Sequence, residues 1–86
     1  MKDDALLNIR EEIDKIDDQI VNYLNLRFSL ALDVAEIKKD LGIPIFNAKR
    51  EEEVLKNVSD KSRYKENVKT VFETIIEESK KLQRKD

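Results

Sequence analysis

The chain has 86 residues, of which 42% are charged, and its 19 acidic and 17 basic residues give a formal net charge of −2. It contains no cysteine and no histidine, which excludes a disulfide framework, a thiolate metal site and the commonest general base. The two signs of charge are interspersed and no apolar run approaches the roughly 20 residues that span a bilayer, which argues against a nucleic-acid partner and a membrane protein.

With one glycine and one proline, the composition favours a single all-α domain over residues 1–86. The first predicted helix covers about 4–41, with Asp3 and Asp4 as candidate N-cap residues. Its apolar residues recur at spacings of three and four, as on an amphipathic helix. They are Leu6, Ile9, Ile13, Ile16, Ile20, Tyr23, Leu30, Val34 and Ile37.

Such a helix is too long to be covered by its own chain. About 36 residues extend on the order of 54 Å, whereas a compact monomer of this size has a radius of gyration near 12 Å. The remaining residues cannot bury the whole apolar stripe, so we expect a homodimer, the commonest symmetric solution.

Three cations lie on or beside this stripe. Arg27 occupies a position where the pattern calls for an apolar residue. It therefore either belongs to a strained structural pair or binds a ligand. Lys38 follows on the same face, and it could equally be an exposed lysine that the helix dipole favours. Arg10, beside the stripe, is by itself typical of a solvated surface residue.

Gly42 and Pro44 end the first helix. A second helix is predicted over about 47–58, with Asn47 as its N-cap. Glu51 shares a face with the apolar Val54, Leu55 and Val58, where it serves either the helix dipole or a ligand.

A third helix is predicted over about 64–83. Its apolar stripe contains Phe72, Ile75 and Ile76, and Ser79 and Gln83 continue the same face. A serine there often bonds only to the carbonyl four residues back, and a glutamine near the end of a helix is usually exposed.

Together the inward faces carry cations, one acceptor and neutral donors, without a nucleophile. These residues are Arg27, Lys38, Glu51, Ser79 and Gln83, with Arg10 and Arg50 nearby. Guanidinium groups bind carboxylates bidentately, so the set suits a small dianion rather than hydrolysis, metal chemistry or covalent catalysis.

Nearly the whole chain resembles the all-helical class of chorismate mutase. The resemblance rests on residues 6–13 with Asp17, Leu26-Arg27, 34–38, Pro44-Ile45 leading to Arg50-Glu51, and 72–79 with Gln83, at matching spacings. It implies an intertwined homodimer of three-helix chains whose active sites are shared. The implied reaction is the rearrangement of chorismate to prephenate in phenylalanine and tyrosine biosynthesis, without a cofactor.

The resemblance also implies residue roles. Arg27, Lys38 and the partner chain's Arg10 would hold the two carboxylates, and Lys38 and Gln83 would face the ether oxygen. Glu51 and the backbone near Asn47 would receive the ring hydroxyl, and Arg50 and Ser79 would support the ring. Val34, Val54, Ile76 and Lys80 would form the pocket wall, although Lys80 stands where the family commonly has an apolar residue and can snorkel outward.

Two alternatives stay open at this point. An isochorismate pyruvate-lyase of the same fold uses a similar cationic pocket, and a non-catalytic helical dimerisation or regulatory module would need no pocket. Because no apolar run is long enough to span a bilayer and Met1–Leu7 lacks the hydrophobic core of a signal peptide, the protein is expected to be cytoplasmic.

Overall fold

The computed structural model describes residues 1–85. It contains three helices, α1 (Lys2–Leu41), α2 (Ala48–Asp60) and α3 (Lys65–Gln83), and no strand within that range. The all-α prediction is therefore confirmed, including the long first helix. Contacts divide the chain into two units, Met1–Leu30 and Ala31–Asp86.

The start of α1 differs from the prediction. The helix begins at Lys2, so Asp3 and Asp4 lie in its first turn instead of capping it. The predicted N-cap role is therefore wrong. The positive end of the helix dipole stabilises acidic residues inside the first turn, so Asp3 and Asp4 also suit the positions that they occupy.

Unit 1 consists of one helical segment whose apolar stripe is uncovered in the single chain. None of the residues 1–30 is buried. The stripe residues Leu6, Ile9, Ile13, Ile16 and Ile20 are 47–59% exposed. A helix segment of this kind gains most of its stability from packing of the apolar face, and no residue within unit 1 supplies that packing.

Unit 2 begins with the last turns of α1, which end as predicted at Gly42. The backbone φ of Gly42 is +68°, a left-handed conformation that glycine adopts without a Cβ penalty. The Gly42 N–H donates to the Lys39 carbonyl at 3.2 Å and the Ile43 N–H to the Lys38 carbonyl at 2.8 Å. This pair of bonds is a Schellman motif, which satisfies the last carbonyls and turns the chain sharply.

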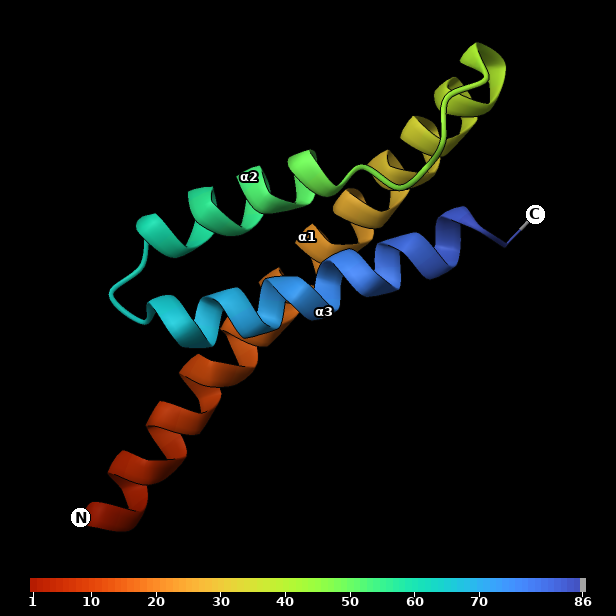
Figure 1. Cartoon of the computed structure of the whole chain (residues 1–86). Helices are drawn as coiled ribbons and strands as arrows, with labels where there is room; N and C mark the ends of the chain where they lie inside the picture. Colours follow the sequence, from red (N-terminus) through yellow and green to blue (C-terminus); the bar gives the residue numbers. More distant parts are fainter. Residues whose placement is uncertain (86) are drawn as a thin grey trace. The chain divides into compact units, whose positions relative to one another are not determined.

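Helices α2 and α3 lie side by side in unit 2 and run in opposite directions (Figure 1). Asn47 caps α2, as predicted, because its side-chain oxygen accepts from the Arg50 N–H at 3.1 Å. The polar connection is shorter than expected, since α2 continues to Asp60 and α3 begins at Lys65. Among residues 1–85 only Ile76 and Ser79, both on α3, are buried.

Candidate active site

The predicted site residues of unit 2 come from all three of its helical segments. Lys38 lies on the last turns of α1, Glu51 on the first turn of α2, and Ser79, Lys80 and Gln83 on the last turns of α3. Ser79 is buried and the other four are half-buried. In a chain that is mostly exposed, polar residues with so little exposure are candidates for a binding site.

Gln83 is held by a backbone carbonyl far away in the sequence. Its amide nitrogen Nε2 donates to the Ala31 carbonyl oxygen at 2.9 Å. An amide nitrogen carries two hydrogens, so this bond orients the carboxamide and leaves a second hydrogen for a ligand. The prediction that Gln83 continues the inward face of α3 agrees with this contact.

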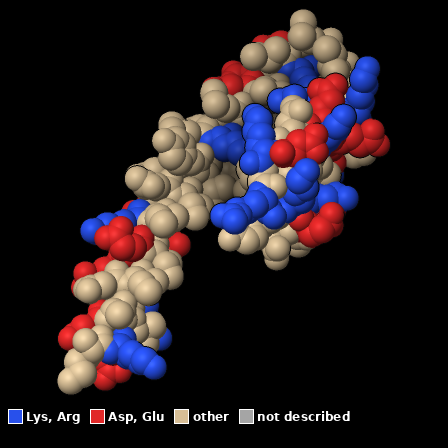
Figure 2. Space-filling model, turned by 90° about the vertical axis from the view of Figure 1, so that its left-hand side faces the viewer, with Lys and Arg blue, Asp and Glu red and all other residues tan. Residues whose placement is uncertain are grey.

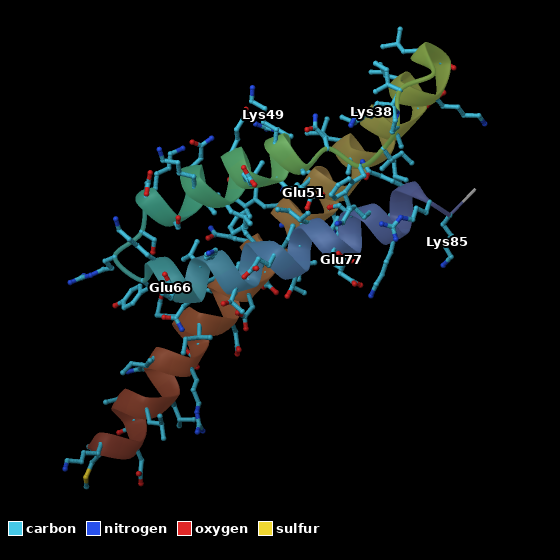
Figure 3. The ribbon with its side chains drawn as sticks, in the orientation of Figure 1. Lys38, Lys49, Glu51, Glu66, Glu77 and Lys85 are labelled. Atoms are coloured by element: carbon cyan, nitrogen blue, oxygen red, sulfur yellow. The ribbon has the colours of Figure 1, made fainter. Side chains whose placement is uncertain are left out.

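Lys38 is anchored to the loop that follows its own helix. Its Nζ donates to the Ile45 carbonyl oxygen at 3.0 Å, while its backbone carbonyl accepts from the Ile43 N–H. The side chain therefore reaches back to the loop (Figure 3 labels Lys38). Two of its three ammonium hydrogens are left for other acceptors.

Glu51 faces α3 and meets Lys80. Lys80 Nζ lies 3.4 Å from Oε2 and 3.5 Å from Oε1 of Glu51, and 3.3 Å from Oε2 of Glu77. It also lies 5.1 Å from the centre of the Phe46 ring. With its side chain only 15% exposed, Lys80 does not snorkel outward, because these acceptors and the ring lie on the inner side.

The remaining predicted residues of unit 2 are placed differently. Arg50 is exposed, and its Nη1 lies 3.5 Å from Oε2 of Glu53 on the same helix. The Ser79 hydroxyl donates to the Ile75 carbonyl at 2.9 Å, and a hydroxyl oxygen can also accept. Of the predicted wall residues, Ile76 is buried, Val54 half-buried and Val34 43% exposed.

Arg10 and Arg27 belong to unit 1. Arg10 is exposed and Arg27 half-buried on α1. They are 17 residues apart on one helix, which corresponds to about 25 Å along the axis and roughly 100° around it. Two groups so placed on one straight helix cannot meet the same small molecule.

A groove of about 700 Å³ opens in unit 2 and shares Gln83 with the candidate site. It is lined by Leu32, Ala35, Glu36, Lys39, Ile43, Pro44, Ile45 and Gln83. On α1 its lining residues fall roughly 130° around the helix from Val34 and Lys38, by helical geometry. The half-buried polar residues Lys38 and Glu51 do not line this groove, so the groove is separate from most of the candidate site.

Sequence reasoning missed four of the groups around this face. The carbonyls of Ala31 and Ile45 carry no sequence signal, because every residue has one. Phe46 and Glu77 contact Lys80. An aromatic residue in the loop after α1, and an acid three residues before Lys80 on a helix, were the available signals.

Comparison with known proteins decides the family. The sequence matches the family described as Chorismate mutase type II over residues 9–84. The chain belongs to this family. The match covers α2 and α3 completely and all but the first turns of α1.

Individual relatives agree with the assignment. The chain is 39% identical to a chorismate mutase of Methanocaldococcus jannaschii over 94% of this chain and 86% of that protein. The structure of form II chorismate mutase from Thermus thermophilus is similar, with a TM-score of 0.90 at 25% identity over 94% and 96% of the two chains. A conserved hypothetical protein from Pyrococcus furiosus has a TM-score of 0.79 at 43% identity over 92% and 95%.

Proposed function

We propose that this member of the chorismate mutase family converts chorismate to prephenate in the biosynthesis of phenylalanine and tyrosine. The main support is the placement of two N–H donors, Lys38 and Gln83, each oriented by a backbone carbonyl with hydrogens to spare. In the described residues no helix is long and apolar enough to cross a membrane. We also propose that the protein acts in the cytoplasm, on a metabolite of this pathway.

The reaction is a one-step [3,3]-sigmatropic rearrangement, so it needs no acid, base, nucleophile or cofactor. An enzyme accelerates it by holding the substrate in its compact conformer, in which the bond-forming carbons approach each other. It also stabilises the negative charge that develops on the ether oxygen as that bond lengthens. Fixed N–H donors in a partly dehydrated site supply this stabilisation at no further cost of reorganisation.

We assign the residues of this chain accordingly. Lys38 and Gln83 donate to the ether oxygen, and Lys38 also meets a carboxylate. Glu51 accepts from the ring hydroxyl. Further contacts come from Arg10, Arg27, Asn47, Arg50 and Ser79, with Val34, Val54 and Ile76 as walls, and Lys80 lies against Glu51.

The site is proposed to be shared by two chains of a homodimer. One support is the separation of Arg10 and Arg27, which cannot both reach one substrate from the same helix. Another is the exposed apolar stripe of unit 1, whose residues Leu6, Ile9, Ile13, Ile16 and Ile20 are 47–59% exposed. This stripe is where a partner helix would pack.

The test is product formation from two substrates. Purified protein is incubated separately with chorismate and isochorismate, and prephenate and salicylate are quantified by chromatography. We expect prephenate from chorismate and no salicylate from isochorismate. A Lys38→Ala/Gln83→Ala double variant, purified identically, controls for mutase carried over from the expression host.

Two results would contradict the proposal. Salicylate as the main product would identify a lyase of the same fold. Absence of both products from a folded dimer, together with no binding of a dicarboxylate transition-state mimic, would favour a non-catalytic dimerisation or regulatory module.

A further inference from the structure

Lys80 forms an ion pair that differs in kind from three pairs found within single helices of the described residues. The pairs Lys15–Glu12, Arg50–Glu53 and Lys81–Glu78 each join residues three apart on one helix, and their side chains are 48–71% exposed. The Lys80–Glu51 pair instead joins α3 to α2, with side chains only 15% and 27% exposed. Pairs with little exposure are screened less by water and salt, so this contact fixes the carboxylate more firmly than a surface pair would.

The geometry leaves Glu51 able to bind a second donor. Lys80 Nζ lies at nearly equal distances, 3.4 and 3.5 Å, from the two carboxylate oxygens. A carboxylate has about four acceptor sites, and one ammonium at these distances does not saturate them. The carboxylate is thus oriented by Lys80 and can still accept a hydrogen bond from a ligand hydroxyl.

The positive charge of Lys80 also lowers the repulsion between the Glu51 carboxylate and an anionic ligand. Glu51 is an anion in a site proposed to bind a dianion, and like charges in a partly dehydrated pocket repel each other. A lysine in contact with Glu51 offsets that repulsion. Glu77 also pairs with Lys80, at 3.3 Å, but its side chain is 53% exposed and it lies on α3 itself (Figure 3).

We propose that Lys80 is a positioning residue for substrate binding, acting through Glu51. This inference rests on the proposed function. Lys80 holds the Glu51 carboxylate toward the substrate's ring hydroxyl and neutralises it, while the Phe46 ring lies beside the ammonium group. Because Glu51 would meet the hydroxyl in both the ground state and the transition state, Lys80 acts mainly on KM.

The experiment compares three variants with the wild-type chain by steady-state kinetics with chorismate. Lys80→Met keeps a flexible apolar chain of similar length at a position where an apolar wall is tolerated, and we expect KM to rise about tenfold with kcat within about threefold. Lys80→Arg should recover most of the loss. Glu77→Gln, the matched control, removes the other carboxylate partner and should change KM by less than about twofold.

A double-mutant cycle separates positioning from packing. If Lys80 acts through Glu51, then adding Lys80→Met to a Glu51→Gln variant should change KM by less than about twofold, because no carboxylate remains to be oriented or neutralised. Circular dichroism and size-exclusion chromatography verify that each variant is folded and assembled, and Lys80→Gln replaces Lys80→Met if the latter is not.

The inference is overturned by an unchanged KM in folded Lys80→Met, or by a tenfold effect that persists in the Glu51→Gln background. The second result would mean that Lys80 binds substrate directly or only packs. Failure of the proposed function is a separate result, because there the wild-type chain itself forms no prephenate.

Discussion

The Nε2 atom of Gln83 donates a 2.9 Å hydrogen bond to the carbonyl oxygen of Ala31, 52 residues earlier in the chain. The bond joins the last turn of α3 to α1 within unit 2 and determines where the second amide hydrogen points. Removal of the amide should cost one transition-state donor. We expect Gln83→Ala to lower kcat by 10²–10³, about 3–4 kcal/mol.

The control for that measurement is Arg84→Ala, the exposed neighbour at the end of α3, which should change kcat by less than about twofold. A kcat of Gln83→Ala within a few-fold of wild type, in a dimer of normal helicity, would remove Gln83 from the mechanism.

Lys38→Ala should lower kcat by at least about 10², since its ammonium group also meets charge that appears mainly in the transition state. The change removes the bond to the Ile45 carbonyl as well, so thermal unfolding is measured beside the kinetics. Lys39→Ala, one residue along and exposed, is the matched control. Near-native turnover of Lys38→Ala would show the mechanism to be wrong.

Asn47→Asp tests whether its side chain takes part in binding. An aspartate oxygen can accept the same bond from the Arg50 N–H and suits the positive end of α2, so the stability should be kept or raised slightly. We expect kcat/KM to change by less than about tenfold, or about 1.4 kcal/mol. A hundredfold change in either direction would show that the side chain contacts the substrate.

Gly42→Ala tests the turn that carries the Lys38 loop. A Cβ at Gly42 would meet no atom within 4 Å, so the cost comes only from the backbone, whose φ is +68°. We expect a loss of about 1–2 kcal/mol in the free energy of unfolding, measured by urea denaturation. Gly42→Asn should lose less, because asparagine tolerates this conformation, and equal losses would contradict the explanation.

Mixing two inactive variants tests the shared site. If Arg10 and Arg27 bind one substrate from different chains, a heterodimer of one Arg10→Ala chain and one Arg27→Ala chain has two unequal pockets. One pocket contains both substitutions and the other contains neither. Random reassociation makes about half the dimers heterodimers, so activity should recover to about a quarter of wild type. Subunit exchange is verified with differently tagged chains, and no recovery after exchange would exclude a shared site.

On the face shown in Figure 2, Lys and Arg side chains lie beside Asp and Glu side chains, and the remaining surface is formed by other residues. This matches the interspersed charges and the net charge of −2 of the sequence. A dianionic ligand would therefore be recognised by a few placed cations and donors rather than by a broad positive field.

Local sequence signals account for the three helices and most of their ends. Helical periodicity, the Asn47 cap and the left-handed Gly42 can be read from the chain, because the groups that satisfy the backbone there lie within about five residues. The start of α1 was misjudged, since acidic residues suit both an N-cap and a first turn. The inward side of α3 was also readable, as Ile76 and Ser79 are buried.

The contacts of the site side chains, in contrast, depend on the tertiary structure. Gln83 bonds to the Ala31 carbonyl, and Lys80 turns inward to Glu51, 29 residues away. Periodicity assigns a residue to a face about 100° wide, but a lysine or glutamine has several rotamers that reach different partners from that face. Which rotamer is most stable depends on carbonyls, carboxylates and rings brought close by other helices, and no spacing within one helix encodes those positions.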